Sequence, residues 1–175
     1  IELLLGTELN IMNAQGKIDL PDSVLESLDI AIASIHLPCF KDERTIDNVT
    51  AAYEKVMEHP YVDIIGHLDD GRFPVDMKRL VKKAKETGTL LEVNNSSLRP
   101  EGFRENTKEN CLEMVRECKA QGVMIVLGSD SHVDADIAEY PYAEEILRET
   151  DFPEELVANV SLEKLKACIK HGKKL

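Results

Sequence analysis

Residues 30–36 read IAIASIH, a continuous apolar run that ends in a histidine. Such runs are typical of strands in a parallel sheet that is covered on both faces. Three more follow in the chain: VDII at 62–65, LLEV at 90–93 and MIVL at 124–127. The runs start at positions 30, 62, 90 and 124, so their starts are 32, 28 and 34 residues apart. Each interval fits one strand–helix unit of about 30 residues.

The segments between the runs show the periodicity of amphipathic helices, with apolar residues along one face. These residues are Ile46, Val49, Tyr53, Val56 and Met57; Met77, Leu80, Val81 and Ala84; Cys111, Met114, Val115 and Cys118; and Leu162, Leu165 and Ile169. Repeated strand–helix–strand units predict an α/β fold with a parallel sheet and right-handed crossovers. Periodicity alone leaves open whether the sheet is doubly wound or closed into a barrel.

Several residues with strong positional preferences predict where helices and turns begin and end. They are a capping box at Asn106 and Glu109, an N-cap at Ser161, first-turn prolines at Pro74 and Pro153, residues past a helix end at Gly88 and Gly122, and a hairpin turn at Asn13 to Gly16.

The composition excludes several classes of function. A net charge of −12 argues against binding to nucleic acid or to an anionic membrane surface, which requires clustered lysine and arginine. There is no signal peptide and no apolar run of about 18 residues, so we expect a cytoplasmic protein. The 175 residues are expected to form one domain, and the four cysteines, which include no CxxC pair, to be reduced and packed.

The chain opens on Ile1, already inside an apolar run and without a methionine. Native chains seldom begin in the middle of a strand, so we expect 1–175 to be an incomplete piece of a longer domain. Its first strand is expected to contain Leu3 to Glu8.

Polar residues of the kinds that bind metals follow each apolar run. The carboxyl ends of parallel strands lie at one edge of a sheet, where α/β proteins build their sites. Histidine and carboxylate side chains gathered there are typical ligands of transition metals. The residues are Glu8 after the first run, then His36, then His67, then Asn94 and Asn95, and finally Asp130 and His132.

Each of these residues also has an ordinary structural interpretation. A lone histidine at a strand end is more often packed or partly solvated than a ligand, and Glu8 alone reads as a loop carboxylate. Asp130 alone fits a cap of the following turn, and His132 fits a hydrogen bond to a nearby carbonyl. The metal interpretation is favoured because the five residues at equivalent positions would otherwise need five separate explanations. In addition, burying a carboxylate without a partner costs free energy.

Five blocks of sequence together resemble the PHP (polymerase and histidinol phosphatase) domain family, and most closely its small stand-alone bacterial phosphoesterases of the YcdX-like branch. The likeness runs essentially end to end, and its most specific parts are EVNNSS and LGSDSH. The blocks are LLGTELNI, IASIHLP, DIIGHLDDGRFPVD, LLEVNNSSLR and VLGSDSH.

The resemblance implies a distorted, TIM-like (β/α)7 barrel that holds up to three divalent ions of zinc, manganese or iron. It implies that Glu8 bridges two ions, that His36 and His67 bind one of them, and that Asp130 and His132 complete the remaining positions. The family begins with a His-x-His strand and a second strand ending in Asp-His, which are absent here, since the first histidine is His36. We therefore expect 1–175 to lack the first two strands, and an N-terminal segment or an oligomeric partner to complement them.

The implied reaction is hydrolysis of a small phosphorylated substrate, with a metal-activated water attacking phosphorus. Glu8, Asp130 and His132 are the predicted catalytic residues, the last two as proton shuttles. Arg72, Asn94, Asn95 and Arg99 are predicted to bind substrate. For Arg72 the alternative is a surface ion pair with Asp69 or Asp70, and for the others it is hydrogen bonding that fixes a loop.

Two other functions stay open. An amidohydrolase-like enzyme also gathers histidine and aspartate at barrel strand ends, but it commonly uses a modified lysine, and no lysine stands at a strand end here. A catalytically inactive metal-binding module, or an inactive fragment, would retain the same residues without turnover.

Overall fold

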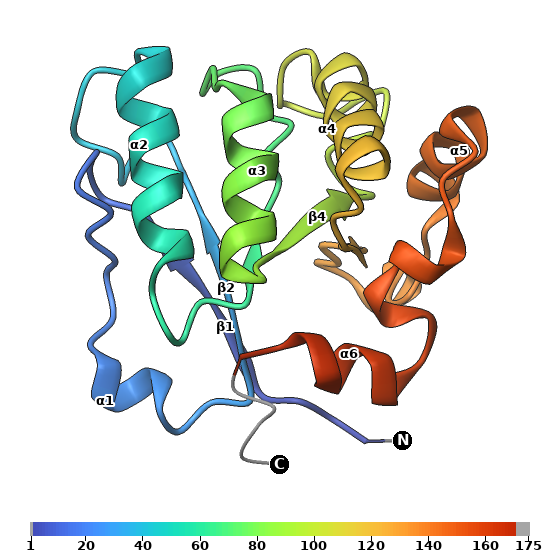
Figure 1. The fold of residues 1–175 in the computed structure, drawn as a ribbon, viewed down its shortest axis with the longest axis horizontal. Coiled ribbons are helices and arrows are strands. Elements are labelled where there is room, and N and C mark those ends of the chain that lie inside the picture. Colours follow the sequence, from blue (N-terminus) through green and yellow to red (C-terminus); the bar gives the residue numbers. More distant parts are fainter. Residues whose placement is uncertain (1, 171–175) are drawn as a thin grey trace.

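The computed structural model describes residues 2–170, which form one parallel sheet flanked by helices (Figure 1). The strands are β1 (Gly6–Asn10), β2 (Ile30–Ser34), β3 (Ile64–Ile65), β4 (Leu90–Asn94) and β5 (Ile125–Gly128). All neighbours pair in parallel, and the order across the sheet is β1-β2-β3-β4-β5. A strand order that follows the chain is that of a singly wound sheet, because a doubly wound sheet reverses its order at a switch point.

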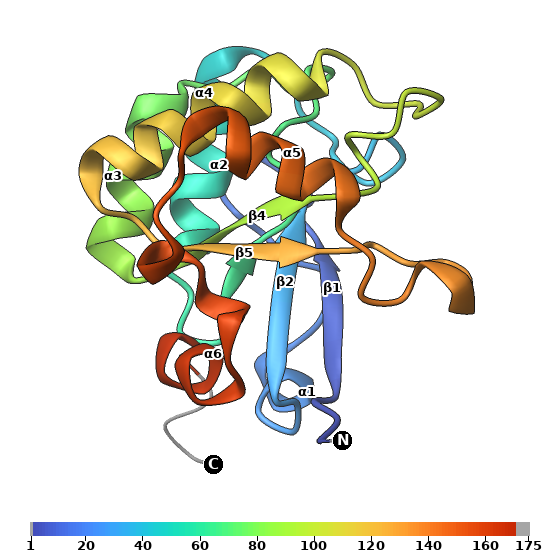
Figure 2. The same ribbon diagram turned by 90° about the vertical axis from the view of Figure 1, so that its right-hand side faces the viewer.

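Helices lie between successive strands and after the last one. They are α1 (Asp22–Leu25), α2 (Ile46–Met57), α3 (Met77–Thr87), α4 (Thr107–Gln121), α5 (Pro141–Thr150) and α6 (Leu162–Cys168), with 3-10 turns at Asp134–Asp136, Glu154–Leu156 and Ala158–Val160. Helices α2, α3, α4 and α5 stand side by side over one face of the sheet, while α6 lies below its other face (Figures 1 and 2). None of the helices among residues 2–170 is long and apolar enough to span a membrane.

The alternation of side chains along each strand divides the core into two parts. The larger part faces α2 to α5 and includes Leu9, Ala33 and Leu91. The smaller part lies on the other face and is built from Ile64, Leu90, Val126, Ala158 and Ile169. Both faces of the middle strands are therefore covered, as the continuous apolar runs predict, and every residue of β4 is buried.

Some predicted boundaries are confirmed. Ser161 caps α6 by accepting a hydrogen bond from the Lys164 N–H, and Gly88 and Gly122 end α3 and α4 in the left-handed conformation. Residues 13–16 form the predicted tight turn, in which Gly16 N–H donates to the Asn13 carbonyl. The four cysteines are free, also as predicted.

Other predicted boundaries are wrong. Asn106 takes a positive φ of 51° and its side chain makes no capping hydrogen bond, so there is no capping box. Pro74 precedes the true N-cap of α3, which is Asp76, and Pro153 only precedes a 3-10 turn; the proline at a helix start is Pro141. At α3 a nearby residue caps the helix instead, because the Asp76 side chain accepts from the Arg79 N–H.

The first strand begins later than predicted, at Gly6 instead of Leu3. The Leu5 N–H donates to the Asp29 carboxylate at 2.8 Å, and the Asp29 N–H donates back to the Leu5 carbonyl, so a side chain ends the ladder there. Leu3 and Leu5 are exposed. Ile1 lies outside the described residues.

The sheet among residues 2–170 is open, with β1 and β5 as its outer strands. The outer edge of β5 is partly covered. Val157 makes a parallel bridge to Ile125, and the Asn159 side chain accepts from the Leu127 N–H at 3.0 Å and donates to the Leu127 carbonyl at 2.9 Å. The parallel α/β class is as predicted, and closure into a barrel remains a prediction.

Gly88 offers a test of the backbone geometry at the end of α3. Its φ is +69° and no atom lies within 4 Å of the place of a Cβ, so a substitution there is strained without being crowded. We expect Gly88→Ala to lower the free energy of unfolding by about 1–2 kcal/mol, and Gly88→Asn by less, since asparagine tolerates this conformation. Urea unfolding measures both, and an alanine variant as stable as the parent would contradict the assignment.

Candidate metal centre

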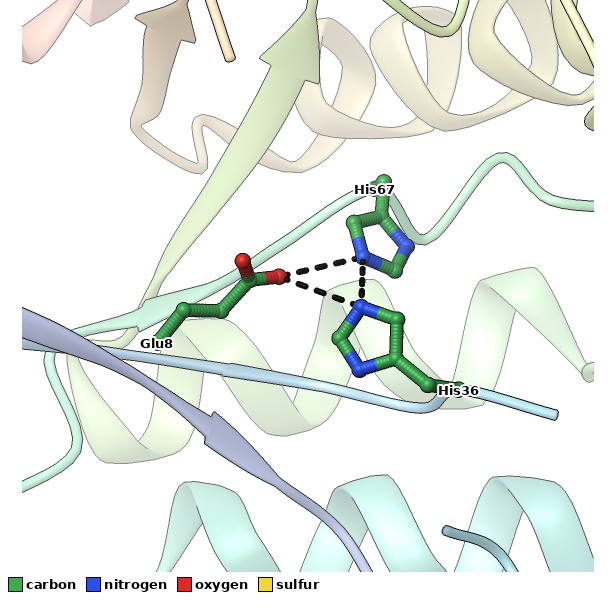
Figure 3. Close-up of side chains that lie close together, drawn as sticks. All are labelled: Glu8, His36 and His67. Carbon is green, nitrogen blue, oxygen red and sulfur yellow. Dashed lines mark hydrogen bonds and ion pairs between the residues drawn. The ribbon is translucent and has the colours of Figure 1, made fainter. Parts of the chain in front are cut away.

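Three side chains from successive strands meet at the carboxyl end of the sheet (Figure 3). Glu8 comes from β1, His36 follows β2 and His67 follows β3. The Glu8 Oε1 atom lies 3.2 Å from His67 Nε2 and 3.5 Å from His36 Nε2, and the two Nε2 atoms are 3.1 Å apart. One potential ligand atom from each residue thus lies within 4.8 Å of the others.

Glu8 differs from the prediction in its position within the strand. It lies in the middle of β1, opposite Ile32, instead of at the strand's end. It still reaches the histidines because it points to the face away from α2, opposite to its buried neighbour Leu9, and a glutamate side chain is long. The Glu8 side chain is 42% exposed and that of His67 only 3%, so the group is buried at His67 and accessible to solvent at Glu8.

His36 is held in a defined orientation by Asn10 and Asp19. The Asn10 side-chain amide donates to Asp19 Oδ2 at 2.6 Å, so the Asn10 carbonyl oxygen faces His36 and accepts from its Nδ1 at 2.8 Å. In neutral His36 the proton is therefore on Nδ1, which leaves the lone pair of Nε2 available to a metal ion. Metal-binding histidines are commonly oriented in this way by a hydrogen bond at the other nitrogen.

The three residues fit a divalent cation. Zinc binds imidazole nitrogen at about 2.0–2.1 Å in tetrahedral geometry, which places two such nitrogens roughly 3.3–3.4 Å apart. The 3.1 Å observed between the two Nε2 atoms is close to that separation. Two imidazoles and a carboxylate are a set of donors that zinc, manganese and iron accept.

The charge balance points in the same direction. Hydrogen bonds from His36, and then from His67, hold the pKa of the Glu8 carboxyl well below its ordinary value, against the opposing effect of burial. Glu8 is therefore a carboxylate at neutral pH. A negative oxygen beside two imidazole nitrogens, whose hydrogen bonds already stabilise its charge, is a site that a cation would stabilise in the same way.

The other two predicted ligands lie outside this group. Asp130 follows β5, and its carboxylate accepts from Asn94 Nδ2 and from Arg104, each at 3.2 Å. His132 is 85% exposed, and its Nδ1 lies 3.0 Å from the Asp130 backbone carbonyl. The structure therefore brings together three of the five predicted ligands, and the metal-binding role of Asp130 and His132 stays a prediction.

The four predicted substrate-binding residues all make contacts within the protein. Arg72 Nε donates to both carboxylate oxygens of Asp70, at 2.9 and 3.0 Å, which is the ion pair given above as its alternative. Arg99 pairs with Asp136 at 2.7 Å. Asn94 is buried beside Asp130, while the Asn95 carbonyl oxygen accepts from the first backbone N–H groups of α5. Asn94 and Asn95 therefore fix loops in this structure, and substrate contact stays a prediction for all four.

Three charged residues of this region were not predicted to be part of the site. Glu92 is buried in β4, Asp69 lies just past His67, and Arg104 pairs with Asp130. Burial raises the pKa of the Glu92 carboxyl, and it raises that of Asp69 to about 7. The sequence did contain a signal for Glu92, because it is the single charge inside the apolar run LLEV.

Taken together, the fold and this group define a parallel α/β protein with a candidate metal centre at the carboxyl ends of its strands. Comparison with known proteins gives the family. The chain is 43% identical over 175 residues to a probable phosphatase of Clostridium novyi, covering all of this chain and 70% of that protein. It is 40% identical over 173 residues to a probable phosphatase of Acetivibrio thermocellus, covering 99% and 70%. The chain belongs to this family of probable phosphatases.

Among solved structures, the fold is similar to that of a histidinol phosphate phosphatase from Lactococcus lactis, determined with zinc, L-histidinol and phosphate. The TM-score is 0.53 at 15% identity, over 75% of this chain and 61% of that one. At this identity the likeness concerns the fold alone. No protein-family model matches the chain.

The hydrogen bond from His36 to Asn10 gives a test of the metal centre. Asn10→Ala removes the acceptor that fixes the His36 ring, so we expect zinc affinity to fall by about 10- to 100-fold. Competition with a chromophoric chelator measures it. Asn48→Ala is the control, because the Asn48 side chain donates to the Glu43 carbonyl near the start of α2. Equal affinities for both variants would show that Asn10 does not support the site.

Proposed function

We propose that this protein is a metal-dependent phosphatase that hydrolyses a small phosphorylated substrate. The observation that carries the proposal is the convergence of Glu8, His36 and His67 on a solvent-accessible point, in a chain 43% identical to a probable phosphatase. The zinc, L-histidinol and phosphate in the solved Lactococcus lactis phosphatase of similar fold add support for a metal and a phosphate ester.

A divalent ion held by these residues would supply positive charge to the phosphate and lower the pKa of water. The chain's own contribution is to hold the ligands rigidly. Glu8 supplies the negative charge, while His36 and His67 present nitrogen lone pairs. Asp130 and His132, on the loop after β5, are proposed as further ligands and as the groups that carry protons. Zinc is the first candidate, with manganese or iron as alternatives and up to three ions in all.

The finer family assignment is also part of the proposal. A PHP-type, YcdX-like domain that includes all of 1–175 accounts for the strand order β1 to β5 and for candidate ligands within β1 and just after β2 and β3. We also propose that an N-terminal segment or another subunit completes the barrel. The amidohydrolase-like alternative has less support, because the five strands contain no lysine. An inactive metal-binding module would bind the ion without turnover.

Glu8 tests the proposal most directly. Glu8→Gln keeps the size of the side chain but removes the negative charge between the two histidines. We expect bound metal and turnover of p-nitrophenyl phosphate to fall together, each by at least about 10-fold. Metal content by elemental analysis and initial rates measure the two effects. Glu54→Gln, on the surface of α2, is the control for a lost carboxylate.

Full metal occupancy in Glu8→Gln would rule out Glu8 as a ligand. Removal of metal with a chelator should abolish activity, and addition of zinc or manganese should restore it. Activity that survives complete removal of metal would contradict the proposed chemistry.

Arg72 tests the substrate-binding part. If Arg72 leaves Asp70 to contact a phosphate, Arg72→Ala should raise KM with little change in metal content. A hydrogen bond to a charged group is worth roughly 1.5–3 kcal/mol, so the increase should be about 10-fold or more. Steady-state kinetics measure it, with Arg79→Ala, which loses the surface pair with Glu54, as the control. An unchanged KM would leave Arg72 with its structural pairing to Asp70 alone.

A further inference from the structure

The buried carboxylate of Glu92 lies at the centre of a set of hydrogen bonds that reach two of the predicted ligands. Its Oε2 atom accepts from the His67 backbone N–H at 2.8 Å and from Asn94 Nδ2 at 3.1 Å. The same Asn94 nitrogen lies 3.2 Å from Asp130 Oδ2. One buried oxygen therefore connects the residue after β3 with the residue after β5.

Gly128 makes room for this carboxylate, and Gly66 lies beside it. A Cβ at Gly128 would lie 1.9 Å from Glu92 Oε1, and a Cβ at Gly66 would lie 3.4 Å from Oε2. Gly66 immediately precedes His67, and Gly128 stands two residues before Asp130. The absence of a side chain at Gly128 leaves the space that the Glu92 carboxylate occupies.

Both connected residues have a backbone conformation that needs support. His67 has a φ of 31° and Asp130 a φ of 48°, values that residues other than glycine adopt only at a cost. Such conformations persist where the surroundings hold them. At His67 that support includes the hydrogen bond from its N–H to Glu92.

His67 also lacks the kind of support that His36 has. His36 is oriented through its ring, by the bond from Nδ1 to Asn10. The buried Nδ1 of His67 has no hydrogen-bond partner among residues 2–170. The direction of the His67 ring therefore depends on its backbone and packing, and the backbone is what Glu92 holds.

We propose that Glu92 is a positioning residue of the metal centre, which fixes His67 directly and Asp130 through Asn94. The inference rests on the proposed function, because it concerns the metal ligands of that same site. Glu92 does not itself touch the metal or the substrate. It sets the geometry in which Nε2 of His67 meets Glu8 and His36.

The test compares two substitutions at this position. Glu92→Gln retains an oxygen of the same reach, whereas Glu92→Met has similar length and no acceptor. We expect zinc affinity to fall by about 10- to 100-fold in Glu92→Met and by no more than a few-fold in Glu92→Gln. The visible absorption of the cobalt(II)-loaded protein should change in Glu92→Met and keep its form in Glu92→Gln.

Val93→Ala is the matched control for stability. Val93 is fully buried in the same strand but belongs to the core that faces α2 to α5, so its truncation weakens β4 without touching the site. Urea unfolding gives the free energy of unfolding of each variant. If Val93→Ala lowers zinc affinity as much as Glu92→Met does at similar loss of stability, or if Glu92→Met binds zinc normally, the inference is overturned.

A measurement without metal separates this inference from the proposed function. Hydrogen exchange of the His67 amide, followed by NMR in the metal-free protein, should accelerate in Glu92→Met and stay slow in Glu92→Gln. Slow exchange in both variants overturns the inference whatever the metal does. Failure of the unsubstituted protein to bind zinc or cobalt overturns the proposed function, and with it the role of Glu92 at a metal centre.

Discussion

Neighbouring strands of a parallel sheet place residues in register on the same face, and the site of this protein depends on that constraint. Glu8 is opposite Ile32, and Glu92 is opposite Val126, so residues two positions further on each strand continue along the same face. Towards the amino ends this face is apolar and rests on α6; towards the carboxyl ends it becomes polar. A shift of one residue in any strand would turn its polar side chains into the opposite core, at a large cost in unpaired buried groups.

The parts of the fold that could be predicted are those governed by periodicity. Continuous apolar runs identified β2 to β5, and the helical pattern identified α2, α3, α4 and α6. Histidines directly after β2 and β3 were correctly placed together, because the carboxyl ends of adjacent parallel strands are always neighbours. These inferences use only the backbone geometry that all such sheets share.

The remaining features depend on contacts between residues that are distant in the chain. The start of β1 is determined by Asp29, which takes the hydrogen bonds of Leu5. The orientation of His36 depends on Asn10 and, behind it, Asp19. Arg72 had two plausible partners, and only the folded loop shows that Asp70 is in reach. Side-chain pairing of this kind leaves no periodic pattern in a sequence.

Asn159 has a consequence for how the molecule behaves among its own copies. Its side chain donates to and accepts from the same residue of β5, as the backbone of an added strand would, yet it presents no backbone for a further strand to extend. An edge strand with free N–H and C=O groups is a template for sheet-to-sheet association between molecules. Here the Asn159 amide occupies the N–H and C=O groups of Leu127, so this part of the β5 edge offers no free backbone groups to a strand of a second molecule.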